Sequence, residues 1–474
     1  MSAVLKETNA SGGSQASVEQ AGWPSSWLTL SHGIRSGRYT DPAFARLEYE
    51  KLWSHVWQAA ARLDEIPAAG DYTTYDIGDQ SVLIVRVDAD TIKAYHNVCP
   101  HRGTALSPGG CGHFANEKII CPFHGWRWDT RGHNEFVLER HEFRDGKLQD
   151  SDVALREVKH VVFAGFIFIN LDPNPESFDD FIAPVRELIE GLAIGEMRHY
   201  WWKAIPVASN WKVAQEAFFE GYHVPATHPQ LEPHSADFIY NPQPPDAKPD
   251  FNHWNVDYQV YAHGHGRFFG IKSPMKGNVR PAGDGDMVEA MAARLNLLAV
   301  GMDAQVLPED VEIVRSLKGK PIPEGSNLGA EYVKALYMRA AEQHRPMPKP
   351  VPEVLGQWGG EIFIFPNLMI LPQAGNAMIY RVRPDPLSPD HCTFEILSTK
   401  TYAAAVKPSR AVVQTVTDLT DPEQVLAIPR QDLGNIPRMQ KGLHSKGCKQ
   451  IWLASHNEKI IMNMHQELDR FLKG

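Results

Sequence analysis

The sequence predicts an α+β protein in which a small antiparallel β-barrel domain precedes a larger domain, an antiparallel sheet flanked by helices. Two observations predict this class. Short runs of β-branched and aromatic residues crowd residues 70–170. Four runs of the same kind follow between residues 361 and 397, joined by turns that contain Pro or Gly. The 474 residues are also too many for one ordinary core, so two or three domains are expected.

The sequence divides into three parts along the chain. Residues 1–50 are expected to hold a mobile leader over 1–22, rich in Ser, Gly, Ala and Gln, and the start of a helix over 41–57 with Asp41 as its N-cap. The barrel domain is expected over 51–170. The larger domain is expected over 171–474, after a Pro-rich linker that begins at Asp172.

Within the two domains, hydrophobic patterns predict the individual elements. Barrel strands are expected at 72–77, 81–87, 91–95 and 161–169. The larger domain should begin with a helix at 179–192, a strand at 199–206 and a helix at 210–223 that ends before Pro225. Its later elements should be strands at 361–365, 368–371, 377–382 and 393–397 and a closing helix at 457–472.

Residues 241–355 are expected to form a variable insertion between these elements. A strand at 256–269 and helices at 286–298 and 330–341 are expected there. The insertion either covers a substrate cavity or has a plain structural role. His263 and His265 lie beside glycines in an expected turn, so we interpret both as solvent-exposed and not as metal ligands.

Composition excludes several classes of function. The net charge of −10 gives no reason to expect nucleic acid or an anionic membrane as a partner. Lys6 and Glu7 lie where a signal peptide would be apolar, and no apolar run reaches 18 residues. Five cysteines do not make a disulfide framework, so a reducing cytoplasm is expected.

Two short loops carry the chemistry of the first domain. Residues 99–103 read Cys-Pro-His-Arg-Gly and residues 121–126 read Cys-Pro-Phe-His-Gly-Trp. Each loop offers one thiolate and one imidazole, from Cys99 and His101 and from Cys121 and His124. A Rieske-type [2Fe–2S] cluster needs this set, with two Cys on one iron and two His on the other. A structural zinc site is the alternative, but zinc fingers usually pair Cys with Cys and His with His. Cys111 is interpreted as a free thiol.

A second metal site is suggested by His223 and His228. An iron that activates O₂ uses two His and one carboxylate on one face. Glu220 lies three residues before His223, so the two should share a face of the expected helix. A His-x₄-His spacing is weak evidence by itself, and such pairs more often pack or face water.

Both stretches resemble the Rieske non-haem iron oxygenases, in particular the alpha subunits of the aromatic-ring-hydroxylating dioxygenases. The resemblance rests on the His-Arg-Gly and His-Gly-Trp endings of the two loops and on Asn210-Trp-Lys, Glu216, Glu220-Gly-Tyr-His223 and His228. It implies that 51–170 is the Rieske domain and 171–474 the catalytic domain with a mononuclear Fe(II).

The resemblance also implies further site residues. The third iron ligand in the family is a late carboxylate, and Asp432 is the best match. Its rivals are Asp418, Asp421 and Glu423. Asn210 and Glu220 are carried over as catalytic residues. Many members have Asp where this chain has Glu220, and that residue links the iron-bound His to a Rieske His, here His124, of the neighbouring subunit in a head-to-tail homotrimer.

These observations lead to three functional hypotheses. The first is a terminal oxygenase that cis-dihydroxylates a small hydrophobic aromatic substrate with O₂. The second is a Rieske monooxygenase that hydroxylates or oxidatively demethylates an aromatic or alicyclic compound. The distant third is an electron carrier or a zinc-binding module. The chain has no G-x-G-x-x-G turn and no plant-type ferredoxin pattern. Electrons from NAD(P)H are therefore expected through a separate reductase, directly or by way of a ferredoxin, and a beta subunit is compatible with the resemblance.

Overall fold

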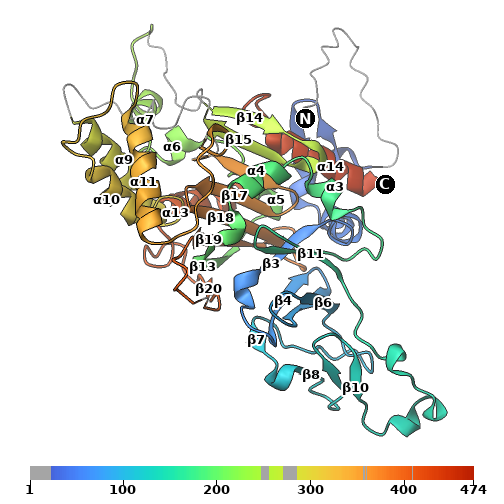
Figure 1. The fold of residues 1–474 in the computed structure, drawn as a ribbon. Coiled ribbons are helices and arrows are strands. Elements are labelled where there is room, and N and C mark those ends of the chain that lie inside the picture. The colour runs from blue at the N-terminus through green and yellow to red at the C-terminus, as the bar shows by residue number, and fades with distance from the viewer. Residues whose placement is uncertain are drawn as a thin grey trace.

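The structure is a computed structural model that describes residues 23–246, 256–270, 286–355, 358, 360–407 and 409–473. The leader expected at 1–22 lies outside these residues, as do parts of the expected insertion. Figure 1 shows a larger body that holds both ends of the described chain and a smaller lobe that projects from it. Among the described residues, no helix is long and apolar enough to cross a membrane.

The first helices are shorter than expected. Asp41 is the N-cap, since its Oδ1 accepts a hydrogen bond from the backbone N of Ala43 at 2.8 Å. The α-helical part consists of α1 (Gly37–Thr40) and α2 (Pro42–Glu48), and a single wider π-turn then covers Tyr49–Trp53. Helical turns therefore reach Trp53, and the predicted helix over 41–57 is wrong only for residues 54–57, which precede a strand that begins at Gln58.

The smaller lobe consists of short antiparallel strands, as the sequence predicts. One sheet has the order β6 (Ile92–His96), β5 (Gln80–Arg86), β4 (Asp71–Ile77) and β7 (Gly112–His113). A second has the order β10 (Asn134–Phe136), β9 (Arg127–Asp129) and β8 (Lys118–Ile120). A third has the order β11 (Lys159–Phe163), β12 (Phe166–Asn170) and β3 (Gln58–Arg62).

The strand expected at 161–169 is in fact a hairpin. β11 and β12 pair antiparallel, with Phe163 opposite Phe166. The two residues between them, Ala164 and Gly165, have φ of +51° and +79°. Two consecutive residues with positive φ form the tight turn that suits a twisted hairpin. The sequence does not show this turn because apolar residues stand directly on both sides of Ala164 and Gly165.

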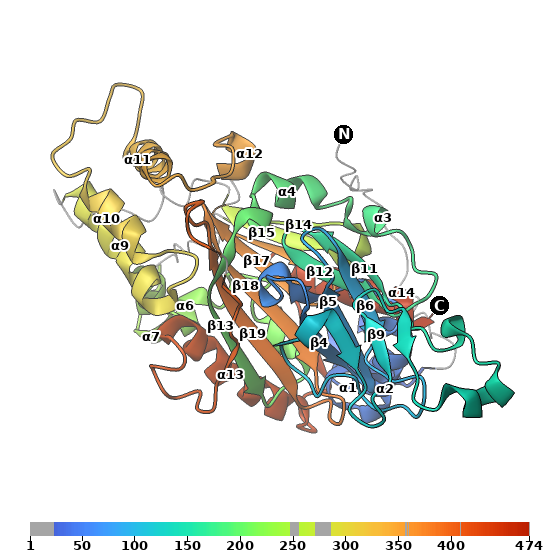
Figure 2. The ribbon, with the colours of Figure 1, turned by 60° about the horizontal axis from the view of Figure 1, so that its bottom comes forward.

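An eight-stranded sheet forms the centre of the larger body (Figure 2). Its order is β14 (Val256–Val260), β15 (Gly266–Gly270), β16 (Glu361–Ile364), β17 (Leu368–Gln373), β18 (Asn376–Pro384), β19 (Cys392–Lys400), β13 (Arg198–Val207) and β20 (Gln414–Thr415). The four expected strands between 361 and 397 are confirmed as consecutive antiparallel neighbours. The strand expected at 256–269 is a hairpin, because residues 261–265 form its turn.

Helices surround this sheet. They are α3 (Phe178–Ile182), α4 (Arg186–Gly191), α5 (Trp211–Glu216), α6 (Val224–Thr227), α7 (Pro233–Tyr240), α9 (Met287–Met302), α10 (Pro308–Arg315), α11 (Leu328–Glu342), α12 (Pro352–Leu355), α13 (Ala427–Leu443) and α14 (Lys459–Lys473). Figures 1 and 2 both place α9, α10 and α11 together at one end of the sheet. A small sheet of β1 (Thr29–Leu30), β2 (Gly33–Arg35) and β21 (Gln450–Trp452) joins the two ends of the described chain.

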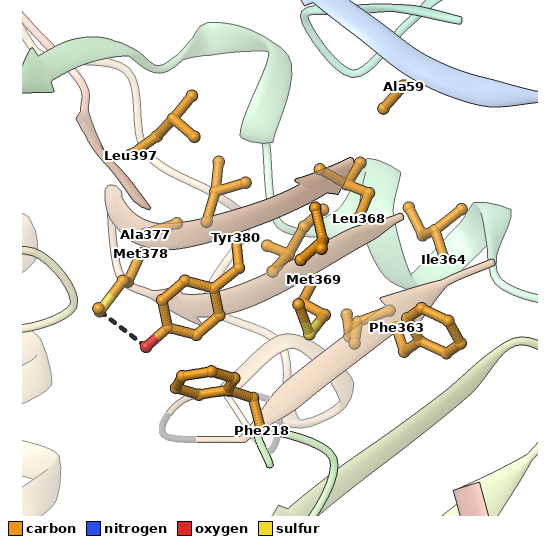
Figure 3. Close-up of a cluster of buried hydrophobic side chains, with 14 of the residues drawn as sticks. Ala59, Phe218, Phe363, Ile364, Leu368, Met369, Ala377, Met378, Tyr380 and Leu397 are labelled. Carbon is orange, nitrogen blue, oxygen red and sulfur yellow. Dashed lines mark hydrogen bonds between the residues drawn. The ribbon is translucent and has the colours of Figure 1, made fainter. Parts of the chain in front are cut away.

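The two faces of the large sheet pack against different partners (Figure 3). Phe363, Met369 and Tyr380 point to one side, toward Phe218. Ile364, Leu368 and Leu397 point to the other side, toward Ala59 of β3. The backbone N of Ala59 donates to Asn367 Oδ1 at 3.0 Å, which fixes β3 to this second face.

The smaller lobe shares the core of the body. β5 alternates, so Val82 and Ile84 belong to the main hydrophobic core, whereas Leu83 and Val85 belong to a separate small core of the lobe. Cys99 and Cys121 lie in that small core. The molecule therefore changes shape near the domain boundary predicted at residue 170, but the hydrophobic core is continuous across it.

Candidate metal centres

The two loops of the smaller lobe have the same local structure. In the first, the backbone N of Cys99 donates to the carbonyl of Thr104 at 2.8 Å, and Gly103 N donates back to Cys99 O at 3.0 Å. The second loop repeats both bonds at the same distances, from Cys121 to Trp126 and from Gly125 to Cys121. The glycine in each loop has a positive φ, which glycine adopts without strain.

The side chains of these loops converge. The Cys99 and Cys121 thiols are buried, and the rings of His101 and His124 lie 4.7 Å apart. Burial, together with the Cys121 thiol beside it, raises the pKa of Cys99 to about 11. Trp126 stacks on the His101 ring at 4.7 Å with an interplanar angle of 8° and so fixes that ring.

The two imidazoles have unsatisfied nitrogen atoms. Nδ1 of His101 and Nδ1 of His124 are both buried and have no hydrogen-bond partner in the structure. A buried polar atom without a partner is unfavourable unless another group satisfies it. Two orphaned nitrogens beside two buried thiols are the donor set of a Rieske cluster, so the residues fit that group.

The second candidate centre lies in the larger body. His223, His228 and Asp432 each offer a ligand atom, and these atoms lie within 4.8 Å of one another. Asp432 Oδ1 is 2.9 Å from His228 Nε2 and 3.6 Å from His223 Nε2. Two His and one carboxylate are the donors that non-haem Fe(II) oxygenases use. The structure therefore brings together the three residues that the sequence and the resemblance select.

Neighbouring side chains orient the two imidazoles. His223 Nδ1 lies 2.8 Å from Glu220 Oε1, and its backbone N donates to Glu220 Oε2 at 2.9 Å. His228 Nδ1 lies 2.8 Å from Gln431 Oε1, which also accepts from Gln230 Nε2 at 2.8 Å. Each Nε2 is thus left to face Asp432, the arrangement that metal-binding His residues commonly have.

Electrostatics at this centre favour positive charge. Burial alone would lower the pKa of His223, but the carboxylates of Glu220 and Asp432 outweigh it and raise the pKa to about 9. The same two carboxylates would favour a metal cation beside His223, whose imidazole has to be neutral to bind it.

The helix expected to carry these residues has a different shape. α5 ends at Glu216, residues 217–223 form turns, and α6 then begins at Val224 with Pro225 in its first turn. The prediction that Glu220 and His223 share a helical face is therefore wrong, although the two side chains do contact each other. Tyr258 explains the turn in part, because its hydroxyl accepts from the backbone N of Gly221 at 3.0 Å.

Asn210 has a structural role in the structure. Its Oδ1 accepts from Lys212 N at 3.1 Å as the N-cap of α5, and its Nδ2 donates to Pro389 O at 2.8 Å. Its backbone N donates to Gln440 Oε1 at 3.1 Å. Both polar atoms of the side chain therefore hold elements together, and the catalytic role of Asn210 stays a prediction.

Other sequence-based candidates lie elsewhere. Asp418, Asp421 and Glu423 are not in the described metal-ligating group, and Asp432 lies on α13, a helix that the sequence analysis missed. His265 is fully buried, so the prediction that it is solvent-exposed is wrong. Its Nε2 lies 2.8 Å from Phe181 O, and its Nδ1 accepts from Phe365 N at 3.1 Å. Both nitrogens are therefore used, and His265 is not free to bind a metal.

Sequence reasoning missed the side chains that orient His228. Gln431 precedes Asp432 directly, so it could have been found by asking which neighbour faces the second imidazole. Gln230 carries no comparable signal. Cys111 is a free thiol, as expected, and lies 3.3 Å from Thr73 Oγ1.

The loop pair and the His–His–carboxylate group, on this fold, define the class of Rieske oxygenases. The model of the Rieske [2Fe-2S] domain matches residues 56–142, and that of the ring hydroxylating alpha subunit (catalytic domain) matches residues 194–474. The second match covers more than half of the chain. The chain therefore belongs to the family of ring-hydroxylating alpha subunits.

Curated relatives match part of the chain. The glycine betaine monooxygenase oxygenase subunit of Chromohalobacter salexigens is 32% identical over 203 residues, 42% of this chain and 44% of that relative. The carnitine monooxygenase oxygenase subunit of Escherichia coli is 32% identical over 198 residues, 40% of this chain and 50% of that relative. The anthranilate 1,2-dioxygenase large subunit of Acinetobacter baylyi is 29% identical over 202 residues, 41% and 42% of the two chains. The chain thus spans about half the length of the curated relatives it matches.

Solved structures share the fold over nearly the whole chain. A quaternary ammonium Rieske monooxygenase in complex with L-carnitine has a TM-score of 0.59 at 16% identity, covering 93% of this chain and 96% of that one. Naphthalene 1,2-dioxygenase from Rhodococcus sp. bound to indole has a TM-score of 0.61 at 18% identity, covering 93% and 94%. At these identities the likeness concerns the fold alone.

Proposed function

We propose that the chain is the terminal component of a Rieske monooxygenase that inserts one oxygen atom of O₂ into a C–H bond of a small organic compound. The convergence of His223, His228 and Asp432 is the observation that carries this proposal. When bound, the cluster supplies single electrons and the mononuclear iron supplies the position at which O₂ is activated. Hydroxylation of a methyl group on nitrogen would appear as oxidative demethylation.

Monooxygenation replaces cis-dihydroxylation as the preferred outcome. The two relatives that match at 32% identity are by name monooxygenases of glycine betaine and of carnitine. This supports the alternative outcome stated above and a substrate that is not aromatic. Cis-dihydroxylation of an aromatic compound remains the second candidate, supported by the match to the anthranilate 1,2-dioxygenase large subunit.

The chain's own residues perform the positioning for this reaction. Glu220 and Gln431 hold the two imidazoles so that each Nε2 faces Asp432. The burial of His228 and Asp432 keeps bulk water from them. In the smaller lobe, Trp126 and the paired loop hydrogen bonds hold the thiols and imidazoles in place.

Electron delivery is proposed to cross a subunit interface. Figure 1 places β8, and Figure 2 places β9, at the opposite side of the molecule from α6 and α13, near which the second centre lies. We infer a head-to-tail homotrimer in which Glu220 meets His124 of the partner subunit, since heterologous contacts close into rings. A separate NAD(P)H-dependent reductase, directly or through a ferredoxin, would supply electrons to the cluster.

The compartment is proposed to be the cytoplasm. All five cysteines are free thiols in the structure, as a reducing environment favours.

The metal content gives the first test. The purified protein should approach three irons and two acid-labile sulfides per chain, the sum of a [2Fe–2S] cluster and one iron. His223→Ala and His228→Ala should each remove about one iron per chain and leave the visible spectrum of the cluster unchanged. Stoichiometric zinc in place of iron, or loss of the visible spectrum in either variant, contradicts the ligand assignment.

Isotope labelling decides between the two outcomes. Turnover under ¹⁸O₂ with a reductase, followed by mass spectrometry of the product, should show one labelled oxygen per product molecule. The trial substrates should include glycine betaine, choline, L-carnitine and a panel of aromatic acids. Two labelled oxygens in a cis-diol would establish dioxygenation instead.

A further inference from the structure

A buried carboxylate that neither metal centre uses lies on the large sheet. Glu361 is the first residue of β16 and is only 2% exposed. In the part of the chain that the structure describes, no hydrogen bond or ion pair joins its side chain to another residue. A carboxylate that is buried without a partner is unfavourable, and proteins seldom keep one without a use.

The strand register places Glu361 on the face of the sheet that packs against the metal-site segment. Side chains alternate along a strand, so Glu361 and Phe363 project from the same face. Phe363 contacts Phe219, the residue before Glu220, with ring centroids 4.3 Å apart. Figure 3 shows Phe363 and Tyr380 on this face.

Aromatic rings share that face with the carboxylate. Glu361 is directly opposite Phe268 on β15, and Phe268 is directly opposite Tyr258 on β14. Residues that pair across antiparallel strands project from the same face. Tyr258 in turn holds Gly221 through its hydroxyl, at 3.0 Å. The acid therefore lies in an aromatic setting beside the segment that carries Glu220 and His223.

Nearby negative charges act on this acid and on Tyr380, which lies on the same face. Burial raises the pKa of Glu361 well above its ordinary value, and the negative charge of Glu220 raises it further. Burial also raises the pKa of the Tyr380 phenol, and the carboxylates of Asp432 and Glu361 both add to the effect. Tyr380 thus lies within electrostatic range of a candidate metal ligand and of the unpaired acid.

We propose that Glu361 is the counter-charge for a cationic group of the substrate, such as a tertiary or quaternary ammonium, bound against the aromatic face formed by Tyr258, Phe268, Phe363 and Tyr380. An ammonium group would pair with the carboxylate and also contact the negative faces of the rings. The ammonium group would supply the positive partner that the Glu361 carboxylate does not find among the described residues. This inference rests on the proposed function, because it makes the site beside the candidate iron centre the substrate site.

Two probes that differ only in charge give the test. Choline carries a trimethylammonium group, and 3,3-dimethylbutan-1-ol is its neutral carbon counterpart of nearly the same shape. Titration calorimetry on the iron-loaded protein should show choline binding at least tenfold more tightly than the alcohol. Glu361→Gln should reduce choline affinity at least tenfold and change alcohol affinity less than threefold. Glu361→Asp keeps the charge and should keep the preference for choline.

Thermal unfolding supplies a readout that a structural role would not give. Because an unpaired buried acid destabilises the empty protein, Glu361→Gln should melt at a higher temperature than the wild type without ligand. The rise in melting temperature that choline causes should be lost in this variant. A lower melting temperature without ligand would show instead that the carboxyl supports the fold, which contradicts the proposal.

The outcomes for binding and for turnover are separable. Equal affinities of the wild type for the two probes, no binding of choline, or an unchanged preference in Glu361→Gln would each overturn the role of Glu361. None of these results requires turnover. Absence of iron or of oxygen incorporation would overturn the proposed function, even where the charge preference is present.

Discussion

At the scale of single residues, hydrogen bonds to the outer nitrogens decide how the candidate iron ligands point. Glu220 does this for His223 and Gln431 does it for His228. The two partners differ in charge, and this difference matters. The carboxylate of Glu220 helps to raise the pKa of His223, whereas the amide of Gln431 is neutral.

The first prediction concerns Gln431. Gln431→Leu removes the acceptor for His228 Nδ1 and should lower iron affinity or activity by about 10–100-fold, the usual effect of losing such a partner. Gln431→Glu keeps an acceptor oxygen and is the matched control, so it should retain more iron. Iron analysis after dialysis at a series of free-iron concentrations checks both variants. Full iron occupancy in Gln431→Leu at every concentration contradicts this role.

A second prediction follows from the burial of His265. Burial lowers its pKa from 6.5 to about 3, so the folded protein keeps the ring neutral. The unfolded chain binds a proton at this ring near pH 6.5, and the folded protein does so only near pH 3. Stability contributed by the neutral ring is therefore complete above pH 6.5 and is lost as the pH falls from 6.5 toward 3, by about 1.4 kcal/mol per pH unit.

Urea unfolding between pH 7 and pH 5 measures this slope. His265→Asn keeps a side-chain acceptor near Phe365 N but does not titrate. Its stability should depend less steeply on pH, by about one proton, than that of the wild type. Equal slopes for the two proteins would show that His265 takes up its proton in the folded state.

At the scale of elements, the sequence predicted those features that depend on residues close together along the chain. The loops of Cys99 and Cys121 close with hydrogen bonds between near neighbours, and Asp41 caps its helix as expected. The four strands from residue 361 onward follow from runs of β-branched and aromatic residues joined by turn residues. These features depend on neighbours a few positions away, which a sequence shows directly.

Elements that depend on distant contacts were not predictable in this way. The turn over 217–223 is held by Tyr258, which lies more than thirty positions further along the chain. Asp432 was selected by resemblance, but its helix was missed because Pro429 and Pro437 interrupt the usual signal. Glu361 looks like an ordinary strand residue until the register places it beside aromatic rings in the core.

Asn210 gives the third prediction. Asn210→Ala removes the cap of α5 and the bond to Pro389 O, so it should lower the free energy of unfolding by about 1–2 kcal/mol. Asn210→Asp keeps a capping oxygen and should lose less. Both variants should bind iron as the wild type does, as measured by iron analysis. If Asn210→Ala kept the stability of the wild type but lost turnover, Asn210 would instead act in the reaction.

At the scale of the whole molecule, the two candidate centres lie in different parts of one chain, and the proposed electron path therefore uses a second chain. Glu220 contacts His223 with both carboxylate oxygens, Oε1 at the ring and Oε2 at the backbone N, and the residue is 8% exposed. In the proposed trimer, the imidazole of the partner's His124 would have to reach the exposed part of Glu220. The proposed trimer therefore makes electron transfer a property of the assembly.

The fourth prediction tests this path. Glu220→Gln keeps the shape and one acceptor but removes the charge, so both metal centres should form while product formation falls at least tenfold. A single-turnover experiment on pre-reduced protein, with O₂ and substrate present, follows the re-oxidation of the cluster. Re-oxidation at the wild-type rate in the variant, or a fully active monomer in solution, would rule this path out.

The core that runs from the smaller lobe into the body has a kinetic consequence. β3 is fixed to the large sheet, and Val82 and Ile84 of the lobe lie in the same core as the body. The lobe that carries the cluster loops is therefore fixed to the body, and it does not move as a separate unit on a flexible linker. Solvent friction should leave its electron transfer unaffected, so added glycerol should not slow cluster re-oxidation. The separation of the redox partners within the assembly then sets the rate.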